Sequence, residues 1–600
     1  MESTQIADNL ETKTEADVIP ENDAKTGDEE KKTEIVDPYA YLKRQDFTSE
    51  KFKIEIRGLP KFYGIGELKK LLNVKLKLGS NKIKPPKRGS HWVYVCFRSE
   101  EDREEALKAI DGFTWKNKTL SAENANAAPD PLVKRRIANN QQDDNTAKRC
   151  KLEDVRTQEE IIKSNATPLC DVPYEEQLKM KQQKARKLLE RFGNELATAN
   201  RSLKPWLDSQ KAKFDGLPCQ LLDIVSVKDH CDGYRNKCEF TIGINQETKE
   251  KAIGFRLGSY VLGNTGVGPI QNLKNIPPRM KEAVSVFEKF VRSSELDVFD
   301  PETQSGHWKQ LTARYGFVTD QLMLIVGVNP QIGSPQQLTE QQLEDVKQKL
   351  RDFFTDGEGK CIKVTSLYFQ IIRKKQAGEI LPSPEHILGE KYIVEVLSGL
   401  KFKISPESFF QINTKTAELL YDNVGNLADL NGETTLLDIC CGTGTIGLSL
   451  ASKCGQVLGL ELIEEAVKYA KENAEENKIT NCEFFCGKAE EIITSVACKA
   501  VHKKVVAVVD PPRAGLHQKA VILLRRLQNI EKMVFLACDA KAALKNFVDL
   551  GRPASKTLTG DPYVPIAAVA VDLFPHTNHC ELVLCFQRMD PGQLSSNDNK

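Results

Sequence analysis

Short, almost continuous runs of apolar residues recur along the C-terminal part of the chain. They cover residues 434–440, 456–461, 507–509 and 532–538, and each has the length and composition of a buried strand in a parallel sheet. A glycine-rich turn and an apolar helical segment, 446–451, follow the first run. This pattern predicts an α/β domain of Rossmann-like type, with strand, tight turn and helix as its first unit.

The chain upstream of that domain has a different pattern. Residues 172–197 are rich in Lys, Glu, Leu and Gln with a helical period, and alternating apolar positions within 322–326 predict strands. We therefore expect residues 172–405 to form a helical lead-in and a central β-rich RNA-binding domain. Arg235 and Lys237, beside aromatic residues, suit phosphate binding, but a solvated strand edge explains them equally well.

Residues 51–124 predict a small β-α-β-β-α-β domain. Its first and third strands are expected at Phe52–Ile56 and Trp92–Phe97, and its helices around Gly66–Leu72 and Glu100–Ile110. This order of elements resembles the ferredoxin-like RNA-recognition motif.

The third strand of this domain carries aromatic residues suited to base stacking. Trp92 and Tyr94 share one face because side chains alternate along a strand, and such a face can stack unpaired bases. Glu55, however, stands where this motif usually has an aromatic residue, and its carboxylate repels phosphates. Basic residues that favour RNA precede the strand, namely Lys82, Lys84, Lys87 and Arg88. RNA binding and a role in protein contact or substrate orientation both stay open.

Polar segments flank the expected domains. Residues 1–50 have few large apolar side chains and are expected to be a disordered tail, as are residues 591–600. Residues 125–171 turn polar and are expected to be a linker. Within it, basic clusters at 134–136 and 148–151 are similar to a bipartite nuclear import signal, so we expect a cytoplasmic protein that also enters the nucleus.

The composition narrows the class of protein. Lys and Arg total 85 and Asp and Glu total 84, so affinity for nucleic acid must come from local basic patches. No apolar run reaches the roughly 18 residues of a membrane span, and no apolar leader follows Met1, so no membrane partner is expected. The 16 cysteines lack paired zinc spacing, and we predict reduced thiols and no metal.

Candidate chemistry lies at the ends of the C-terminal strands. Cys538 ends one apolar run and Glu581 begins another, so a thiol nucleophile and a carboxylate base follow the glycine loop at 442–447. Glu461 ends the strand after that loop, where a carboxylate can accept both ribose hydroxyls of an adenosine. The loop alone also fits a dinucleotide, but the two prolines after Asp510 favour a methyltransferase over a dehydrogenase.

Several segments together resemble the RNA uracil-C5 methyltransferase family. These segments are Phe409–Asn413, Asp510–Leu516 and Phe574–Thr577 with Glu581. The resemblance implies S-adenosylmethionine as cofactor, tRNA or another structured RNA as partner, and residues 406–590 as the methyltransferase domain. It implies cofactor contacts from Gln411, Cys440, Thr445, Glu461 and Asp510. It also implies that Cys538 attacks C6 of a uracil and that Glu581 removes the C5 proton.

Two positions depart from the family pattern. Asp539 replaces the usual asparagine after the nucleophile, and a carboxylate there is expected to raise the thiol pKa of Cys538. Cys440 stands where an aromatic residue is usual, and the iron–sulfur cysteines of the bacterial ribosomal-RNA branch are missing, so no cluster is predicted. We expect methylation of a tRNA T-loop uridine. The alternatives are an RNA-binding or chaperone-like protein with weak or lost activity, and a methyltransferase acting on rRNA or mRNA.

Overall fold

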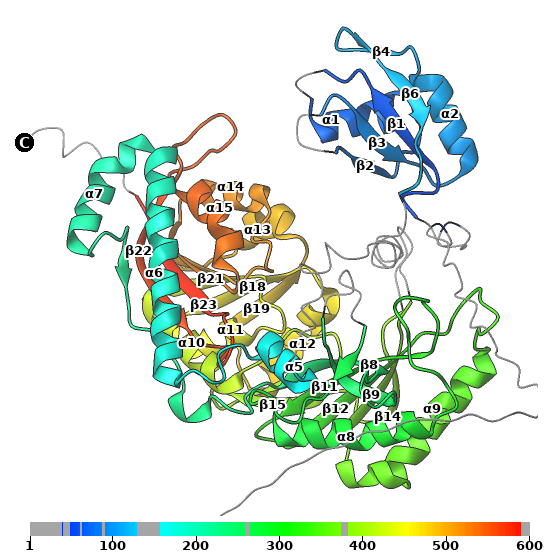
Figure 1. Ribbon diagram of the computed structural model, residues 1–600. Coiled ribbons are helices and arrows are strands. Elements are labelled where there is room, and N and C mark those ends of the chain that lie inside the picture. The colour runs from blue at the N-terminus through cyan, green and yellow to red at the C-terminus, as the bar shows by residue number, and fades with distance from the viewer. Residues whose placement is uncertain are drawn as a thin grey trace, which may run out of the picture. The chain divides into compact units, whose positions relative to one another are not determined.

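The structure is a computed structural model, and Figure 1 shows two units, residues 1–141 and 142–600. The described residues are 39, 42, 48–60, 63–86, 90–128, 156–258, 265–373 and 382–589. Both basic clusters of the expected linker lie outside them, as do Lys87, Arg88, residues 591–600 and most of residues 1–50. Among the described residues, no helix is long and apolar enough to cross a membrane.

The described part of the N-terminal unit contains a four-stranded antiparallel sheet in the order β2-β3-β1-β6. The strands are β1 (Lys53–Arg57), β2 (Lys82–Lys84), β3 (Val93–Cys96) and β6 (Ser121–Asn124), with a small hairpin of β4 (Thr114–Trp115) and β5 (Lys118–Thr119). The helices are α1 (Ile65–Lys70) and α2 (Glu100–Ile110). Ile54, Ile56, Val93 and Val95 face the helices in one core, so the alternating Glu55 and Tyr94 face away from it.

The central region of the second unit is built on a seven-stranded sheet within the described ranges, in the order β10-β9-β8-β11-β12-β13-β14. The strands are β8 (Lys237–Ile244), β9 (Lys251–Arg256), β10 (Val267–Gly268), β11 (Trp308–Gly316), β12 (Gln321–Val328), β13 (Ser366–Ile371) and β14 (Glu385–Gly389). Helices α8 (Pro278–Ser293) and α9 (Glu340–Thr355) pack on it, with Phe287, Leu324 and Leu350 in one core. This is the expected β-rich region.

Helix α5 (Gln158–Ala166) lies inside the segment that was expected to be a linker. It begins with a capping box of Thr157 and Glu160, and Ile162 is buried in the core of the central sheet. The linker prediction is therefore wrong for this segment. A single short apolar stripe on an otherwise polar sequence is too weak a signal to reveal a helix that depends on tertiary packing.

The predicted lead-in helix belongs to the C-terminal domain instead of the central one. Helix α6 (Tyr174–Ala199) is followed by α7 (Lys204–Lys213), and Figure 1 shows α6 lying along the sheet that contains β22 and β23. Phe192 of α6 packs against Phe547 and Phe586 of the C-terminal core. The hairpin of β15 (Ile393–Leu397) and β16 (Leu400–Ile404) also packs in a core of the C-terminal domain. The C-terminal domain therefore includes α6, α7 and this hairpin, and the expected domain boundaries at residues 172 and 405 are wrong.

The C-terminal domain contains an eight-stranded sheet within the described residues, in the order β19-β18-β17-β20-β21-β23-β22-β7. The strands are β7 (Gln220–Leu221), β17 (Thr434–Ile439), β18 (Gln456–Glu461), β19 (Cys482–Cys486), β20 (Lys504–Val509), β21 (Ile530–Ala537), β22 (Tyr563–Val571) and β23 (Glu581–Arg588). β17 to β21 are parallel, whereas β23 is antiparallel to both of its neighbours. The predicted apolar strands therefore form one Rossmann-like sheet.

Helices cover both faces of this sheet. They are α10 (Thr414–Ala428), α11 (Thr445–Leu450), α12 (Glu464–Glu476), α13 (Ala489–Ala497), α14 (Gln518–Arg526) and α15 (Ala540–Gly551). The first three of these pack into one core, and the last three share the other core with α6 and α7. Burial on both faces explains why the strands read as continuous apolar runs rather than alternating ones.

Candidate active site

The carboxyl ends of three parallel strands bring Cys440, Glu461 and Asp510 to one edge of the sheet. Ile439 is paired with Leu460 on one side and with Val509 on the other, so the next residue of each strand lies in one row. The backbone N–H of Asp510 donates to the carbonyl of Ile439 at 3.2 Å. Open α/β sheets bind their ligands at this edge.

The turn after β17 is shaped by residues with positive φ, namely Cys440 at 66°, Gly442 at 55° and Gly444 at 82°. A Cβ added at Gly444 would lie 3.0 Å from the Phe484 ring, whereas one at Gly442 would meet nothing within 4 Å. The backbone of Gly442 is therefore open to a ligand. Its N–H donates to Oε2 of Glu461 at 3.0 Å, which orients that carboxylate.

Glu461 is also held by the residues that follow it. Its Oε1 accepts hydrogen bonds from the backbone N–H of Leu462 at 2.8 Å and of Ile463 at 3.0 Å. The Leu462 and Ile463 side chains are 57% and 56% exposed. An oriented carboxylate beside two exposed apolar side chains can accept hydroxyl groups and pack against a flat apolar ring.

Asp438 is a site residue that sequence reasoning missed. It is fully buried, its Oδ2 accepts from the N–H of Gly447 at 2.9 Å, and its Oδ1 has no partner among the described residues. Burial raises its pKa to about 7, and the negative charges of Asp510 and Glu461 add to the effect. An acidic residue inside an apolar strand was the available signal, since such a group is costly to bury.

The two remaining predicted cofactor residues lie on neighbouring segments. The hydroxyl of Thr445 at the start of α11 is 3.1 Å from that of Tyr421. Gln411 is 8% exposed, and its carbonyl accepts a hydrogen bond from Nδ2 of Asn236 at 2.8 Å. This bond joins the segment before α10 to the central sheet.

The antiparallel pairing of β21 with β23 brings Cys538 and Glu581 together. Ala537 is opposite Leu582, so Cys538, one residue later, and Glu581, one residue earlier, are cross-strand neighbours. Cys538 is half-buried and Glu581 is 3% exposed. A thiol and a carboxyl group that are distant in the sequence therefore meet at the same sheet edge as Asp510.

Burial raises the thiol pKa of Cys538, and the negative charges of Glu581 and Asp510 raise it further. The Arg513 guanidinium and the backbone N–H of Asp539 lower it. The Asp539 carboxylate was expected to raise this pKa, but it instead accepts from the N–H of Ala542 at 3.1 Å and caps α15. The sequence therefore predicted the direction of the Cys538 pKa shift correctly but assigned it to the wrong cause.

Glu581 and Asp510 form a pair of interacting carboxyl groups. Burial raises the pKa of Glu581 well above its usual range, and the charge of Asp510 adds to this effect. Burial raises the pKa of Asp510 to about 7. Oε1 of Glu581 is buried without a hydrogen-bond partner among the described residues. Two such groups resist ionising together, and an ionised Glu581 is a strong base.

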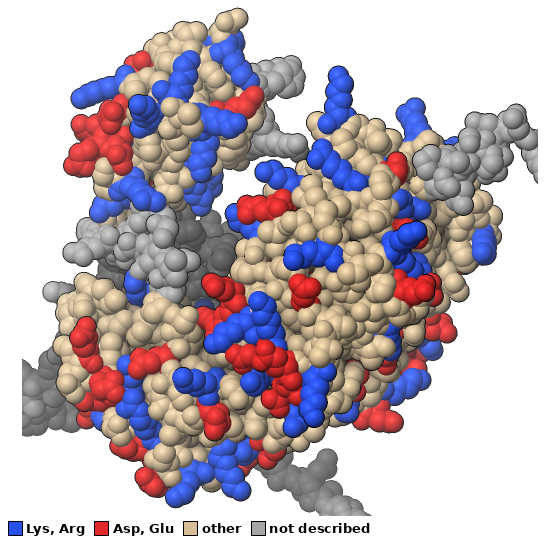
Figure 2. Space-filling model, turned by 180° about the vertical axis from the view of Figure 1, so that it is seen from behind, with Lys and Arg blue, Asp and Glu red and all other residues tan. Residues whose placement is uncertain are grey.

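On the face that Figure 2 shows, the described surface of the second unit is not dominated by charges of one sign. Lys and Arg side chains are interspersed there with Asp and Glu, in keeping with the near balance of 85 basic and 84 acidic residues. This face therefore offers individual basic side chains rather than a continuous basic patch.

The fold and the site define a Rossmann-like methyltransferase, with a glycine turn and strand-end carboxylates beside a thiol. A family model for tRNA (Uracil-5-)-methyltransferase matches residues 359–589. The chain is 39% identical over 557 residues to the tRNA (uracil-5-)-methyltransferase homolog A of Mus musculus, covering 92% of this chain and 86% of that protein. The human homolog A is 38% identical over 558 residues, covering 92% and 85%.

The chain therefore belongs to the tRNA (uracil-5-)-methyltransferase family, and it is an S-adenosylmethionine-dependent methyltransferase, as the sequence predicted. Homolog B of Mus musculus is 40% identical over 435 residues, covering 72% of this chain and 86% of that protein. Among solved structures, the tRNA (uracil-54, C5)-methyltransferase of Pyrococcus abyssi in complex with S-adenosyl-L-homocysteine is 24% identical with a TM-score of 0.48, covering 69% of this chain and 83% of that one.

Proposed function

We propose that this protein methylates C5 of a uridine in the T-loop of tRNA through a covalent adduct with Cys538. The observation that carries this proposal is the cross-strand position of Cys538 and Glu581 beside the strand-end carboxylates. The names of the relatives support tRNA as the substrate. The T-loop position within tRNA is taken from the family resemblance.

The residues at the sheet edge fit S-adenosylmethionine. Glu461 is oriented by the N–H of Gly442 and suits a pair of ribose hydroxyls, and the exposed Leu462 and Ile463 suit an adenine ring. Residues that would line the rest of the cofactor are Gln411, Cys440, Thr445 and Asp510. When bound, S-adenosylmethionine supplies an electrophilic methyl group.

Cys538 would activate the uracil ring. Its thiolate adds to C6, and the displaced electron pair gives an enolate whose C5 is nucleophilic enough to accept a methyl group. The Arg513 guanidinium favours the thiolate. After methylation, C5 carries both the new methyl group and its original proton, and C6 remains bonded to sulfur.

Glu581 would complete the cycle. Its ionised carboxylate takes the C5 proton, the C5–C6 double bond re-forms, and the thiolate of Cys538 leaves. Burial raises the pKa of Glu581, so its carboxylate has a higher proton affinity than an exposed one. The target base must leave its stack to reach both groups.

The N-terminal unit would help to hold the RNA. The Trp92 and Tyr94 rings lie edge to face with centroids 4.9 Å apart, on the sheet face that the helices leave open. The carboxylate of Glu55 was the argument against RNA binding. It forms an ion pair with Nε of Arg57 at 2.6 Å, so its negative charge is compensated. These features support our proposal that this unit is an RNA-recognition motif that binds single-stranded RNA, with protein contact or substrate orientation as the alternative.

Labelled S-adenosylmethionine and unmodified tRNA test the proposal. We expect label in C5-methyluridine with the wild-type protein and with Cys498→Ser, which changes an exposed cysteine outside the site. Cys538→Ser should abolish the label in C5-methyluridine. Label in another nucleotide would refute the reaction. Labelling of rRNA or mRNA but not tRNA would refute the substrate, and RNA binding without label would favour the chaperone-like alternative.

A further inference from the structure

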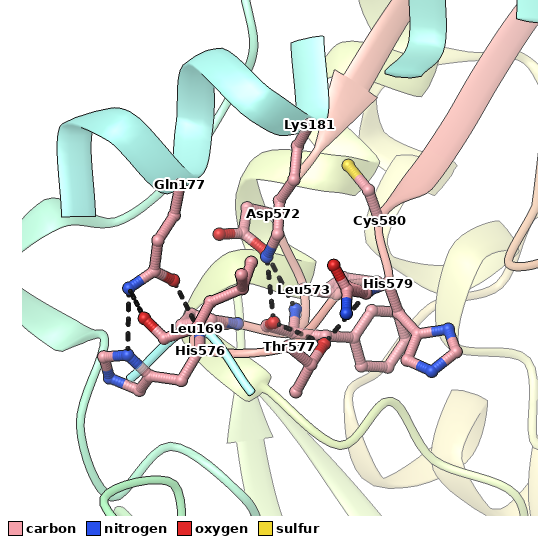
Figure 3. Close-up of polar contacts among 12 residues, drawn as sticks. Leu169, Gln177, Lys181, Asp572, Leu573, His576, Thr577, His579 and Cys580 are labelled. Carbon is pink, nitrogen blue, oxygen red and sulfur yellow. Dashed lines mark hydrogen bonds and ion pairs between the residues drawn. The ribbon is translucent and has the colours of Figure 1, made fainter. Parts of the chain in front are cut away.

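The loop that leads into Glu581 is held by four different segments of the chain, and Figure 3 labels Leu169 and Lys181 from two of them. The carbonyl groups of residues 573–576 each accept a hydrogen bond. Their donors are Asn413 Nδ2 at 3.4 Å, Lys181 Nζ at 3.0 Å, the Tyr234 hydroxyl at 3.0 Å and the Leu169 N–H at 3.0 Å. We call residues 573–580 the base-delivering loop, because β23 and Glu581 begin directly after it.

His576 is the centre of this loop. It is 4% exposed and has a φ of 66°, a conformation that costs energy for a residue with a Cβ. Its backbone N–H donates to Oε1 of Gln177 at 2.9 Å, its Nδ1 is 3.3 Å from Nε2 of Gln177, and its Nε2 is 2.6 Å from Oδ1 of Asp232. The chain Gln177–His576–Asp232 thus links α6, the loop and the central domain.

The proton on the His576 ring can be placed from these partners. Nε2 of Gln177 also donates to the carbonyl groups of Leu169 and Val172, both at 2.9 Å, so the orientation of the Gln177 amide is determined. The amide nitrogen of Gln177 cannot accept a hydrogen bond, so Nδ1 of His576, which faces it, carries no proton in the neutral ring. Nε2 then carries the proton and donates a hydrogen bond to Asp232.

The same tautomer disfavours a metal at this place. Ligand atoms of Cys231, Asp232 and His576 lie within 4.8 Å of one another, which is close enough to suggest an ion. A metal needs an unprotonated Nε2, but the partner of Nδ1 keeps the proton on Nε2. A hydrogen-bonded relay therefore explains the cluster better than an ion does.

We propose that His576, held between Gln177 and Asp232, is a positioning residue for Glu581. The inference rests on the proposed function. If the loop shifts, the Glu581 carboxylate moves away from the C5 proton, whereas Cys538 stays in place at the end of β21. Addition to C6 and methylation then still occur, and the final removal of the proton is slowed.

Asp232→Ala tests this proposal because the Asp232 side chain is 63% exposed, so the substitution leaves the core intact. We expect turnover to fall by roughly 10- to 100-fold, in the range that a small misplacement of a catalytic group produces. A methylated enzyme–RNA adduct on ordinary uridine RNA should accumulate and survive denaturation. Asp232→Asn keeps an acceptor oxygen and should restore turnover. Asp229→Ala, which removes another exposed acid of the same segment, should have no effect.

Other outcomes overturn the proposal. A slower Asp232→Ala enzyme with no adduct, and with equally slow trapping on 5-fluorouridine RNA, would place Asp232 in RNA binding or folding. Stoichiometric zinc binding by the wild-type protein that Asp232→Ala abolishes would establish the metal site instead. If the wild-type protein neither methylates uridine RNA nor is trapped by 5-fluorouridine RNA, the proposed function fails, and this inference fails with it.

Discussion

A fully buried ion pair between Lys181 and Asp572 lies directly before the base-delivering loop. Nζ of Lys181 is 2.5 Å from Oδ1 of Asp572, and both side chains are fully buried. The Tyr174 hydroxyl donates to Oδ2 of Asp572 at 3.0 Å, and the N–H of Phe574 donates to Oδ1 at 3.2 Å. Lys181→Met keeps an unbranched side chain that is one atom shorter and leaves a buried carboxylate without its cation.

The expected loss of stability is large. Removing one partner of a buried ion pair costs about 3–5 kcal/mol. A cooperative unit of about 150–250 residues changes its Tm by about 2–4 °C per kcal/mol. The Tm of the C-terminal domain should therefore fall by roughly 6–20 °C. Adding Asp572→Asn to Lys181→Met removes the unpaired charge and should recover part of this loss.

Calorimetry of the full chain measures this effect. The matched control is Lys179→Met on the same helix, since Lys179 is 72% exposed and pairs with the exposed Glu176. Such a surface pair contributes about 0–1 kcal/mol. A difference of about 2 °C in Tm corresponds to at most ~1 kcal/mol, which is no more than a surface pair contributes. If the Tm of Lys181→Met lies within about 2 °C of this control, the reasoning from burial is refuted.

Three further predictions concern the site itself. Glu581→Gln should methylate uridine RNA once and remain attached to it, visible as a shifted band on a denaturing gel; fast turnover would exclude Glu581 as the base. Trapping of 5-fluorouridine RNA should speed up as pH rises past neutrality, because burial raises the pKa of Cys538, and Arg513→Gln should move this profile to higher pH. Asp438 has a folded pKa of about 7 against an ordinary value of 3.8, so its contribution to stability is present at low pH and is lost as pH rises through about 7. At about 1.4 kcal/mol per pKa unit this is up to ~4 kcal/mol; urea unfolding of Asp438→Asn should lose this dependence, and an unchanged slope would contradict it.

The sequence by itself determined the elements whose pattern is local. The apolar runs became β17, β18, β20 and β21, because burial on both faces requires continuous apolar residues. Cys538, Glu461 and Asp510 were found because each ends such a run. Helix α5 was missed because its few apolar positions become meaningful only against the central sheet.

Only the tertiary structure decided which distant residues meet. No local pattern predicts that β23 pairs between β21 and β22, yet this pairing sets Glu581 opposite Cys538. The docking of α6 on the C-terminal domain, and with it the Gln177–His576–Asp232 relay, likewise depends on packing between segments far apart in the chain. Burial and period are properties of neighbouring residues, whereas strand register and helix docking follow from the competition of long-range contacts.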